Sequence, residues 1–433
     1  MIYNKHYECM DREELAKLQL ARLKDVVSRV YEKVPFYREK MDKAGVKPED
    51  IQTLADINKL PFTNKQDLRD NYPYGLLCSP KSEIVRVHAS SGTTGKPTVV
   101  AYTQNDLDMW AECGARALSA AGASKDSIVQ ISYGYGLFTG GLGAHYGSER
   151  LGCITVPMST GNTKKQILLM QDLGVDTICC TPSYALYLAE EMERAGIDVK
   201  SLNLKNGLFG AEPWSENTRK ELESRLHLKA HDIYGLSEMC GPGVAIECEC
   251  NCGSHIQEDF FYPEIIDEHT LLPLGEGQTG ELVFTTLTKE GMPLIRYRTH
   301  DIASLNYEPC KCGRTTCRMS RVLGRNDDMI IVRGINVFPS QIESVIMSES
   351  DFENQFLLVV TRSGLLDELE IKVEVKKHID FEDKDKIIEL TNKLYKNLMS
   401  TLSIKSKVTL VPNNTMERSQ GKSKRVLDMR DKL

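Results

Sequence analysis

Short apolar strands alternate with helices between about residues 83 and 255, and this alternation constrains the fold more than any other feature of the sequence. Repeated strand–helix alternation predicts a largely parallel sheet covered by helices. Such sheets bind ligands beyond the carboxyl ends of their strands. The strands end in Gly, Pro or Ser: SIVQISYGYG, CITVPMS, VDTICCTPS and LKNGLFGAEP. Helical runs such as TKKQILLMQDLG and SYALYLAEEMERAG lie between them.

The regions on either side of this alternation follow other patterns. Residues 1–75 read as helical, because apolar residues such as Leu15, Val26 and Val30 keep a three- to four-residue spacing. Strands dominate residues 256–326, and residues 327–433 mix strands with one long helix. We therefore predict an α/β fold with a large multi-sheet N-terminal body, residues 1–326, and a small α+β C-terminal domain, residues 327–433.

Composition excludes several classes of function. The chain has 433 residues and a formal net charge of −7, whereas a protein that coats nucleic acid presents a basic face. No stretch approaches the roughly 18 apolar residues of a membrane-spanning helix, and the polar, acidic start is unlike a signal peptide. We expect a cytoplasmic protein with reduced thiols that binds neither nucleic acid nor membrane.

The cysteines are unevenly distributed, which indicates a metal site more than a disulfide framework. CECNCGSH contains Cys248, Cys250, Cys252 and His255, and PCKCGRTTC contains Cys310, Cys312 and Cys317. Four nitrogen and sulfur ligands make a closed tetrahedral zinc site. We predict structural Zn²⁺ at Cys252, His255, Cys310 and Cys312. Cys250 or Cys317 could replace any one of these ligands, and free reduced thiols are the alternative.

ASSGTTGKPT, residues 89–98, combines three Gly or Pro residues with five hydroxyl side chains. Exposed backbone amides and small hydroxyl donors suit phosphate oxygens. The stretch is not a Walker P-loop, since Ser90 stands where that pattern has its first Gly and Pro97 where it has Ser or Thr. A Gly-rich turn without a ligand is the alternative.

Five segments in order resemble the motifs of the adenylate-forming enzymes, the family of acyl- and aryl-CoA ligases. They are SSGTTGKPT, YGLSE, YRTHD, GRNDDMIIVRG and SQGKSKR. Further segments, among them YGYGLFTGGLGAHYGSERLG, FGAEPW and DIYGLSEMCGPGVA, are similar to the phenylacetate–CoA ligases within that family. The resemblance implies the fold of this family, with a small C-terminal domain that is mobile. Asp327, in the hinge motif, is its expected pivot.

The resemblance also implies a two-step reaction. An aryl acid attacks the α-phosphate of ATP to give an acyl-adenylate and pyrophosphate, and coenzyme A then displaces AMP. Glu238 is expected to bind Mg²⁺, which prefers oxygen ligands. Lys422, which follows Gly421 in a basic tail, is the expected catalytic lysine, with Lys424 as its rival. The phosphate loop is expected to be Ser90, Ser91, Gly92, Thr93, Thr94, Gly95 and Lys96, with Lys96 alternatively a solvated loop lysine.

The remaining site residues are expected to bind nucleotide or acid. The nucleotide set is Gly210, Ala211, Glu212, Pro213, Asp232, Tyr234, Gly235, Asp301 and Arg325. Asp301 would accept hydrogen bonds from the ribose hydroxyls; its alternative is an ion pair with Arg296 or Arg298. The acid set is Tyr135, Phe138, Ile233 and Pro242, at an apolar slot for a flat ring.

Two other functions stay open at this point. One is ligation of indoleacetate, benzoate or an aryl ketoacid, which the expected slot residues do not separate from phenylacetate. The other, of a different class, is a non-catalytic nucleotide-binding zinc scaffold. Joint retention of Lys422, Glu238 and Asp301 argues against a scaffold. A homodimer is possible.

Overall fold

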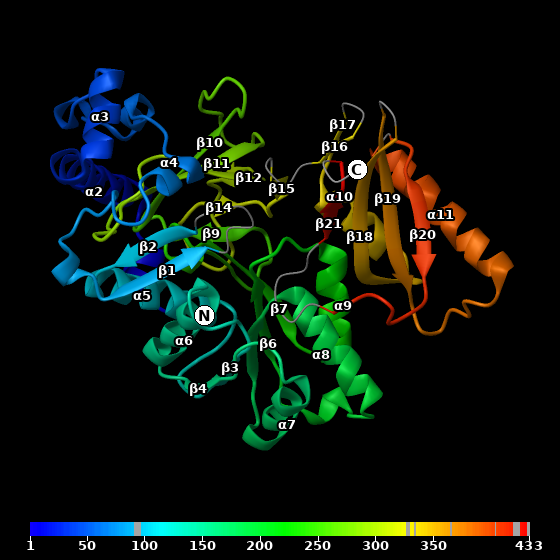
Figure 1. The fold of residues 1–433 in the computed structure, drawn as a ribbon. Coiled ribbons are helices and arrows are strands. Elements are labelled where there is room, and N and C mark those ends of the chain that lie inside the picture. Colours follow the sequence, from blue (N-terminus) through cyan, green and yellow to red (C-terminus); the bar gives the residue numbers. More distant parts are fainter. Residues whose placement is uncertain are drawn as a thin grey trace. The chain divides into compact units, whose positions relative to one another are not determined.

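The computed structural model describes residues 1–90, 97–325, 330–332, 335–363, 366–402, 404–418 and 425–430 (Figure 1). The chain forms two compact units. The large unit is Met1–Cys180, Ser201–Ala211 and Leu228–Arg321. The small unit is Thr181–Lys200, Glu212–His227 and Val322–Leu433. The division expected after residue 326 stays a prediction about domains, and the units differ from it by the two middle segments.

Helices fill the start of the large unit, as the spacing of apolar residues predicts. They are α1 (Lys5–Glu8), α2 (Arg12–Lys33), α3 (Pro35–Ala44) and α4 (Lys65–Asp70), with 3₁₀ turns at Pro48–Asp50, Leu54–Lys59 and Lys81–Glu83. Asp11 caps α2, because its carboxylate accepts the amide hydrogens of Glu13 and Glu14. Leu15, Leu23 and Val30 are buried along one face of α2.

A nine-stranded sheet, in the order β13-β14-β9-β8-β7-β6-β5-β3-β4, forms the centre of the large unit. Its parallel half is β3 (Ile128–Ile131), β4 (Ile154–Pro157), β5 (Thr177–Cys180), β6 (Asn206–Gly210) and β7 (Lys229–Leu236). Its antiparallel half is β8 (Gly241–Glu247), β9 (Ser254–Ile256), β13 (Leu305–Asn306) and β14 (Arg318–Met319). The sheet is therefore less parallel than predicted, because a tight connection after β7 returns the chain as a hairpin.

Helices α5 (Gln104–Ala120), α6 (Thr139–Leu151) and α7 (Thr163–Leu173) also belong to the large unit. Ala117 and Leu118 of α5 pack in one core with Val129 of β3 and Leu208 of β6. Helices α5 and α6 touch through glycine, since a Cβ on Gly147 would lie 2.6 Å from the main chain of α5. The sequence therefore allows the two helices to approach closely.

Two smaller sheets complete the strands that bear on the site. The hairpin of β1 (Arg86–Ser90) and β2 (Thr98–Tyr102) flanks residues 91–96. Strands β10 (Phe261–Ile266), β11 (Gly280–Thr286) and β12 (Tyr297–Ala303) pair antiparallel. Strands are the regular elements described between residues 256 and 325, as predicted.

The small unit is α+β, as predicted. It contains α8 (Pro182–Arg194), a 3₁₀ turn at Val199–Ser201, α9 (Glu216–Leu226), α10 (Pro339–Met347) and α11 (Lys384–Leu402). Its strands are β15 (Gly324–Arg325), β16 (Ile330–Val332), β17 (Ile335–Val337), β18 (Phe352–Ser363), β19 (Leu366–Val375), β20 (Lys407–Val411) and β21 (Val426–Asp428). Four of these strands form a sheet in the order β20-β19-β18-β21, and β16 and β17 form a separate two-stranded sheet. Leu390, Leu394 and Leu398 of α11 are buried at four-residue spacing, in one core with residues of the four-stranded sheet.

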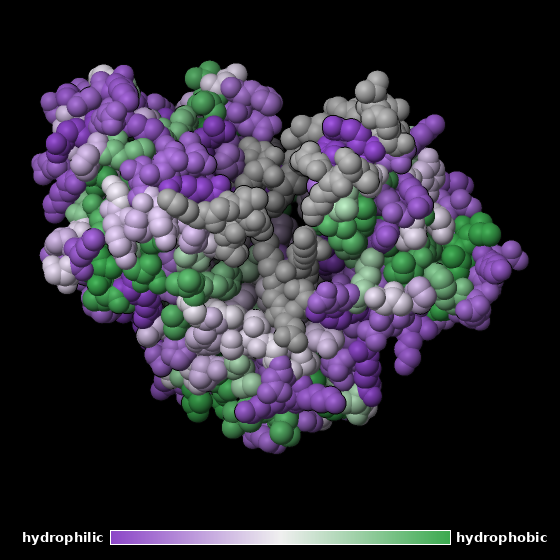
Figure 2. Space-filling view, viewed as in Figure 1, coloured by the Kyte–Doolittle hydropathy of each residue, from purple (hydrophilic) through white to green (hydrophobic). Residues whose placement is uncertain are grey.

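The visible surface is mostly hydrophilic, with smaller hydrophobic patches, one of them over α7 at the bottom of the view (Figure 2). Leu168 and Leu173 of α7 are among the exposed apolar side chains. None of the described helices combines the length and the apolar character that crossing a bilayer requires.

Candidate active site and cysteine cluster

Glu238 lies in the turn between β7 and β8. It is 6% exposed, so it is not the surface residue that a simple turn would present. The turn depends on glycine, since a Cβ on Gly235 would lie 1.9 Å from the carbonyl oxygen of Gly241. Gly241 has φ +105°, a left-handed conformation that favours glycine. The motif thus folds into a tight turn that holds a carboxylate inside the protein.

Side chains from two other elements bond to the main chain of this turn. Tyr102 donates its hydroxyl hydrogen to the carbonyl oxygen of Ser237 at 3.1 Å. Lys289 donates to the carbonyl oxygens of Glu238, at 3.1 Å, and Met239. Burial lowers the pKa of Lys289 to about 8. Sequence reasoning did not find Lys289, which has no motif spacing relative to the turn.

The Glu238 carboxylate accepts no hydrogen bond within the described part of the chain, and the nearest cation is Lys65, with Nζ 4.0 Å from Oε1. A buried carboxylate with available oxygen atoms is a ligand of the kind Mg²⁺ prefers. The residue present at this position therefore fits the metal that the family implies.

Asp301 and Tyr234 meet across two sheets of the large unit. The Tyr234 hydroxyl donates to Asp301 Oδ2 at 2.5 Å, and Asp301 is 4% exposed. The arginines that were the alternative partners of Asp301 pair elsewhere: Arg296 with Glu264 at 2.8 Å and Arg298 with Glu281 at 2.6 Å. Two expected nucleotide residues are thus joined directly, although 67 positions separate them.

The ends of β6 and β7 bring further expected nucleotide residues together. A Cβ on Gly210 would lie 2.2 Å from the carbonyl oxygen of Ile233, so only glycine fits. Ala211 follows with φ 71°, a left-handed conformation that is uncommon for alanine. Asp232 donates its amide hydrogen to Glu247 at 2.9 Å. Gly210 therefore lets the ends of β6 and β7 approach closely, and Ala211 turns the chain directly after β6.

Three expected nucleotide residues belong to the small unit: Glu212, Pro213 and Arg325. Glu212 accepts the Ser183 amide hydrogen at 2.9 Å, at the first turn of α8. This bond places the carboxylate at a helix N-terminus, where negative charge is stabilised. Arg325 lies at the end of the short strand β15.

The hairpin of β1 and β2 contains buried polar atoms for which the described part of the chain provides no hydrogen-bond partner. Ser90 and Thr98 pair across the base of the hairpin. The Ser90 Oγ and Thr98 Oγ1 atoms are buried and have no hydrogen-bond partner among the described residues. The same holds for His88 Nε2. Unpartnered buried hydroxyls are rare and call for an explanation, such as a ligand.

Several expected residues of this loop and of the C-terminal segments lie outside the described residues. They are Ser91, Gly92, Thr93, Thr94, Gly95, Lys96, Asp327, Lys422 and Lys424.

The expected acid-binding residues gather in part. Tyr135 packs against the core that contains Ile233, and its hydroxyl lies 3.3 Å from His145 Nδ1. The Pro242 carbonyl accepts the indole hydrogen of Trp110 at 3.1 Å. Phe138 is 41% exposed, more than a buried slot wall would be.

Trp110 was missed by sequence reasoning. It is 1% exposed, stacks on Tyr102 with ring centres 5.4 Å apart, and meets His88 edge-on at 5.4 Å. A Cβ on Gly143 would lie 2.6 Å from its ring, so this glycine makes room for the indole. An aromatic residue inside a helix carries no signal of such a role.

The cysteine cluster lies at the antiparallel end of the nine-stranded sheet. Ligand atoms of Cys248, His255, Cys310 and Cys312 all lie within 4.8 Å of one another. Cys248 Sγ is 3.7 Å from Cys310 Sγ, and Cys312 Sγ is 3.5 Å from His255 Nε2. Cys248 takes the place that the sequence prediction gave to Cys252. Tetrahedral zinc with Zn–S bonds of about 2.3 Å separates its ligands by distances of this order.

The surroundings of the cluster also distinguish its cysteines. The His255 Nδ1 lies 3.2 Å from the Thr316 carbonyl oxygen, so Nε2 faces the thiols. Cys252 is exposed, and its sulfur lies 3.6 Å from Cys310 Sγ and 2.8 Å from Arg318 Nη1. Cys250 and Cys317, the alternatives considered from sequence, do not belong to the set of four.

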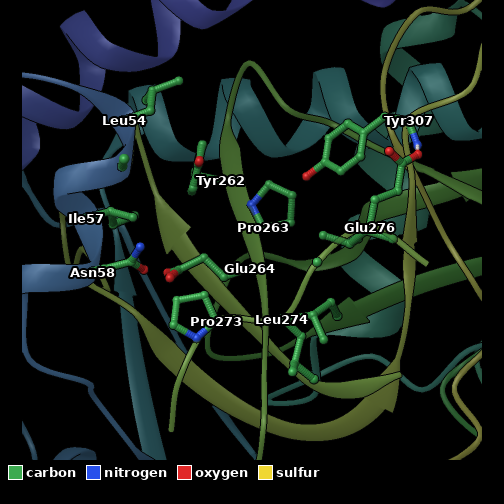
Figure 3. Close-up of a pocket in the computed structure, with 14 residues that line it drawn as sticks. Leu54, Ile57, Asn58, Tyr262, Pro263, Glu264, Pro273, Leu274, Glu276 and Tyr307 are labelled. Carbon is green, nitrogen blue, oxygen red and sulfur yellow. Dashed lines mark hydrogen bonds between the residues drawn. The ribbon is translucent and has the colours of Figure 1, made fainter. Parts of the chain in front are cut away.

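A separate pocket of about 160 Å³ lies in the large unit, and none of the expected site residues lines it (Figure 3). Its labelled walls include Tyr262, Glu264 and Tyr307, and the Glu264 carboxylate points toward Asn58. Glu264 already pairs with Arg296, so the most deeply buried charge in the pocket is neutralised by the protein. The buried carboxylate of this pocket is therefore already in an ion pair.

Comparisons with sequence models and with known proteins match nearly the whole chain. The sequence model of the AMP-binding enzyme matches residues 11–287, and that of the AMP-binding enzyme C-terminal domain matches residues 334–430. A phenylacetate-coenzyme A ligase of Thermus thermophilus is 49% identical over 99% of this chain and 100% of that protein. One of Escherichia coli is 51% identical over 97% of this chain and 96% of that protein.

Solved structures of a 2-hydroxyisobutyryl-CoA ligase are similar in fold. In its postadenylation state with 2-HIB-AMP, that enzyme matches with a TM-score of 0.94 and 28% identity, over 99% of this chain and 93% of the other. In its thioesterification state with 2-HIB-AMP and CoA, the TM-score is 0.73 with 29% identity, over 98% and 92% of the two chains.

Proposed function

The chain belongs to the phenylacetate-coenzyme A ligases of the AMP-binding enzyme family, and from this premise we propose that it joins phenylacetate, or a close aryl acid, to coenzyme A through an acyl-adenylate. The observation that carries the proposal is that Tyr234, which bonds to Asp301 of β12, lies on β7 and that the buried Glu238 lies in the turn directly after β7. The nucleotide-binding scaffold alternative is not favoured, because the relatives that are about 50% identical over nearly the whole chain are ligases.

The reaction has two displacements. A carboxylate oxygen of the acid attacks the α-phosphorus of ATP, and the bond to the bridging oxygen breaks to release pyrophosphate. The thiolate of coenzyme A then attacks the acyl carbon, and the bond to the phosphate oxygen breaks to release AMP. The protein must stabilise charge on the transferring phosphorus and exclude water from the mixed anhydride.

Charge stabilisation falls to three groups in this proposal. The loop of Ser90 to Lys96 supplies amide and hydroxyl donors, and the unpartnered Ser90 and Thr98 hydroxyls support a ligand there. Lys422 supplies a cation to the bridging oxygen during adenylation. Glu238 would hold Mg²⁺, which when bound neutralises phosphate charge.

Nucleotide positioning falls to Asp301. One carboxylate oxygen is held by Tyr234 at 2.5 Å, which fixes the orientation of the group. A fixed carboxylate can accept hydrogen bonds from two neighbouring ribose hydroxyls without losing rotamer entropy on binding. The glycine turn at Gly210 and Ala211 lets the main chain approach the base closely.

Recognition of the acid falls to Tyr135, Ile233 and Pro242, with Phe138 at the exposed rim. Trp110 supports Pro242 through its indole hydrogen bond. Rigid aromatic and glycine surfaces favour a flat ring over a flexible chain, because the ring loses less conformational entropy on entry.

The cysteine cluster would hold structural Zn²⁺ through Cys248, His255, Cys310 and Cys312. The donor set is three thiols and one imidazole, which suits zinc and leaves no open position for chemistry. Bound zinc would tie the turn after β8 to the loop between β13 and β14. The homodimer and the cytoplasmic location expected from the sequence stay predictions.

A panel of acids tests the proposed function directly. We expect pyrophosphate release with phenylacetate or a close aryl acid to have a kcat/KM at least about tenfold above that with acetate or hexanoate. That ratio needs only about 1.4 kcal/mol of transition-state binding. Comparable values for hexanoate and phenylacetate would refute the aryl assignment, and an indoleacetate or benzoate preference would redirect it.

A further inference from the structure

The loop between β11 and β12 is anchored on the start of α5. Asp106 is the capping-box acid of α5, and its carboxylate accepts the amide hydrogens of Glu290 at 2.7 Å and Gly291 at 2.9 Å. The Thr103 hydroxyl donates to the Glu290 carboxylate at 2.9 Å. A Cβ on Gly291 would lie 2.6 Å from the Ala101 carbonyl oxygen. The two residues that follow Lys289 are thus fixed against α5 and β2.

Lys289 extends from this fixed loop into the interior. Its side chain is fully buried, and Nζ lies 4.6 Å from the centre of the Tyr102 ring. No carboxylate oxygen of the described residues lies within ion-pair distance of it; Asp106 and Glu238 attract it from farther away. Burying an ammonium group is unfavourable unless its hydrogens are bonded. Here two of them bond to the carbonyl oxygens of Glu238 and Met239.

Three successive carbonyl groups of the β7–β8 turn are therefore held by side chains from other elements. Tyr102 of β2 holds Ser237, and Lys289 holds Glu238 and Met239. The Glu238 carboxylate itself is left available, near Lys65. This arrangement fixes the backbone of an acidic residue while leaving its oxygen atoms for another partner.

We propose that Lys289 is a positioning residue for adenylation: it fixes the main chain of the turn at residues 237–239 and thereby the place of the Glu238 carboxylate. The ammonium group of Lys289 also places a positive charge 3.1 Å from the Glu238 carbonyl oxygen, and in the proposed function the phosphates of ATP bind near Glu238. The inference rests on the proposed function, in which Glu238 contributes to the first half-reaction and has no part in acyl transfer to coenzyme A.

Lys289→Met tests the inference, because Met keeps most of the chain length and removes the charge and the donors. We expect pyrophosphate exchange to fall about a hundredfold, as for a misplaced catalytic group. Acyl transfer from a supplied phenylacetyl-adenylate should stay within about threefold of wild type. Hydrogen–deuterium exchange of the amides of residues 237–241, measured without metal or nucleotide, should rise about tenfold. Lys43→Met, at an exposed helix position, is the matched control.

Loss of both half-reactions to the same extent would make Lys289 a structural residue and overturn the proposal, as would unchanged exchange of the turn. Should Lys289→Met not fold, Tyr102→Phe decides, since it removes one holding bond and keeps the ring. We expect it to slow adenylation alone by roughly fivefold; equal losses, or none, would overturn the inference. A wild type that exchanges no pyrophosphate with any aryl acid would refute the proposed function instead, and the amide measurement would still report on the turn.

Discussion

The nine-stranded sheet has a parallel half, β4-β3-β5-β6-β7, and an antiparallel half, β8-β9-β14-β13, and the two halves place reactive side chains differently. At the junction with the antiparallel half, β7 and its turn present Tyr234 and Glu238. In the antiparallel half, thiols from two separate loops converge on one another. At the β7–β8 turn the Glu238 carboxylate oxygens are available to a ligand, whereas in the cysteine cluster the ligand atoms lie within 4.8 Å of one another.

The difference follows from which groups of each turn are bonded. The Glu238 turn is a tight hairpin between antiparallel β7 and β8, and side chains from other elements bond to its carbonyl groups and not to its carboxylate. Antiparallel neighbours are joined by short turns, and two turns can be cross-linked by one ion. We therefore expect substitutions at the β7–β8 turn to change activity and substitutions in the cysteine cluster to change stability.

Glu238→Gln should have the largest effect and acts at the β7 turn alone. Removal of the charge should lower adenylation about 10³-fold, since in the proposed function this carboxylate would hold the metal that neutralises phosphate charge. The melting temperature should not change, because Lys289 bonds to the main chain of Glu238 and not to its carboxylate. Pyrophosphate exchange and calorimetry are the measurements. Glu249→Gln, at an exposed position in the cysteine segment, is the control. A fall in melting temperature for Glu238→Gln would contradict the expectation that the β7–β8 turn affects activity and not stability.

Removal of zinc from the cysteine cluster should change stability and not activity. A chelator, or Cys248→Ser, should lower the melting temperature by roughly 5–10 °C, as loss of a ligand bound only by the folded state requires. The kcat of the protein that stays folded should be retained. Elemental analysis of protein purified without added metal should find about one zinc per chain. Absence of zinc, with all clustered thiols freely reactive, would make the cluster a set of reduced cysteines.

Tyr234→Phe removes the hydroxyl that holds Asp301 and keeps the ring. Loss of one hydrogen bond to a charged group should raise the KM for ATP about tenfold with little change in melting temperature. Steady-state kinetics at saturating acid and coenzyme A are the measurement. Tyr262→Phe, in the pocket of Figure 3, is the matched control and should leave the KM unchanged. An unchanged KM in Tyr234→Phe would separate Asp301 from nucleotide binding.

Cys252→Ser should have the smallest effect and identifies the fourth ligand. Cys252 is exposed and lies outside the set of four, so its replacement should shift the melting temperature by less than about 2 °C and leave zinc content at one per chain. Comparison with Cys248→Ser in the same assay is the measurement. Loss of zinc from Cys252→Ser, with zinc retained in Cys248→Ser, would restore the ligand set expected from the sequence.

Much of the fold could be predicted because its signals are local. The one long helix predicted within residues 327–433 is α11, and the four strand segments predicted between residues 83 and 255 contain β3, β4, β5 and β6. Strand β21 was missed, since three residues in a polar tail become a strand only by parallel pairing with β18. The antiparallel half of the large sheet was missed for a similar reason, because the pairing partners of short strands are not written in their own periodicity.

The residues of the candidate site also differ in whether a local sequence signal identifies them. Glu238, Tyr234 and Asp301 could be named because they stand in contiguous motifs with fixed spacing. Trp110 and Lys289 could not, since each reaches the site from an element that has no motif. Burial of Lys289 in particular depends on Asp106, which fixes the loop from a distant helix.

The amino-acid sequence was enough to predict the alternation of strands and helices in residues 83–255, the motifs of the family and the clustering of the cysteines. Which side chains meet follows from the three-dimensional fold: Tyr234 with Asp301, Lys289 with the Glu238 turn, and Cys248 with His255, Cys310 and Cys312. The physical reason is plain at the cysteines. Cys248 and Cys252 are separated by one turn of chain and are equally good ligands by composition. Both sulfurs lie near Cys310 Sγ, at 3.7 and 3.6 Å, but only the buried Cys248 also lies within 4.8 Å of the His255 and Cys312 ligand atoms, which are brought there by the tertiary fold.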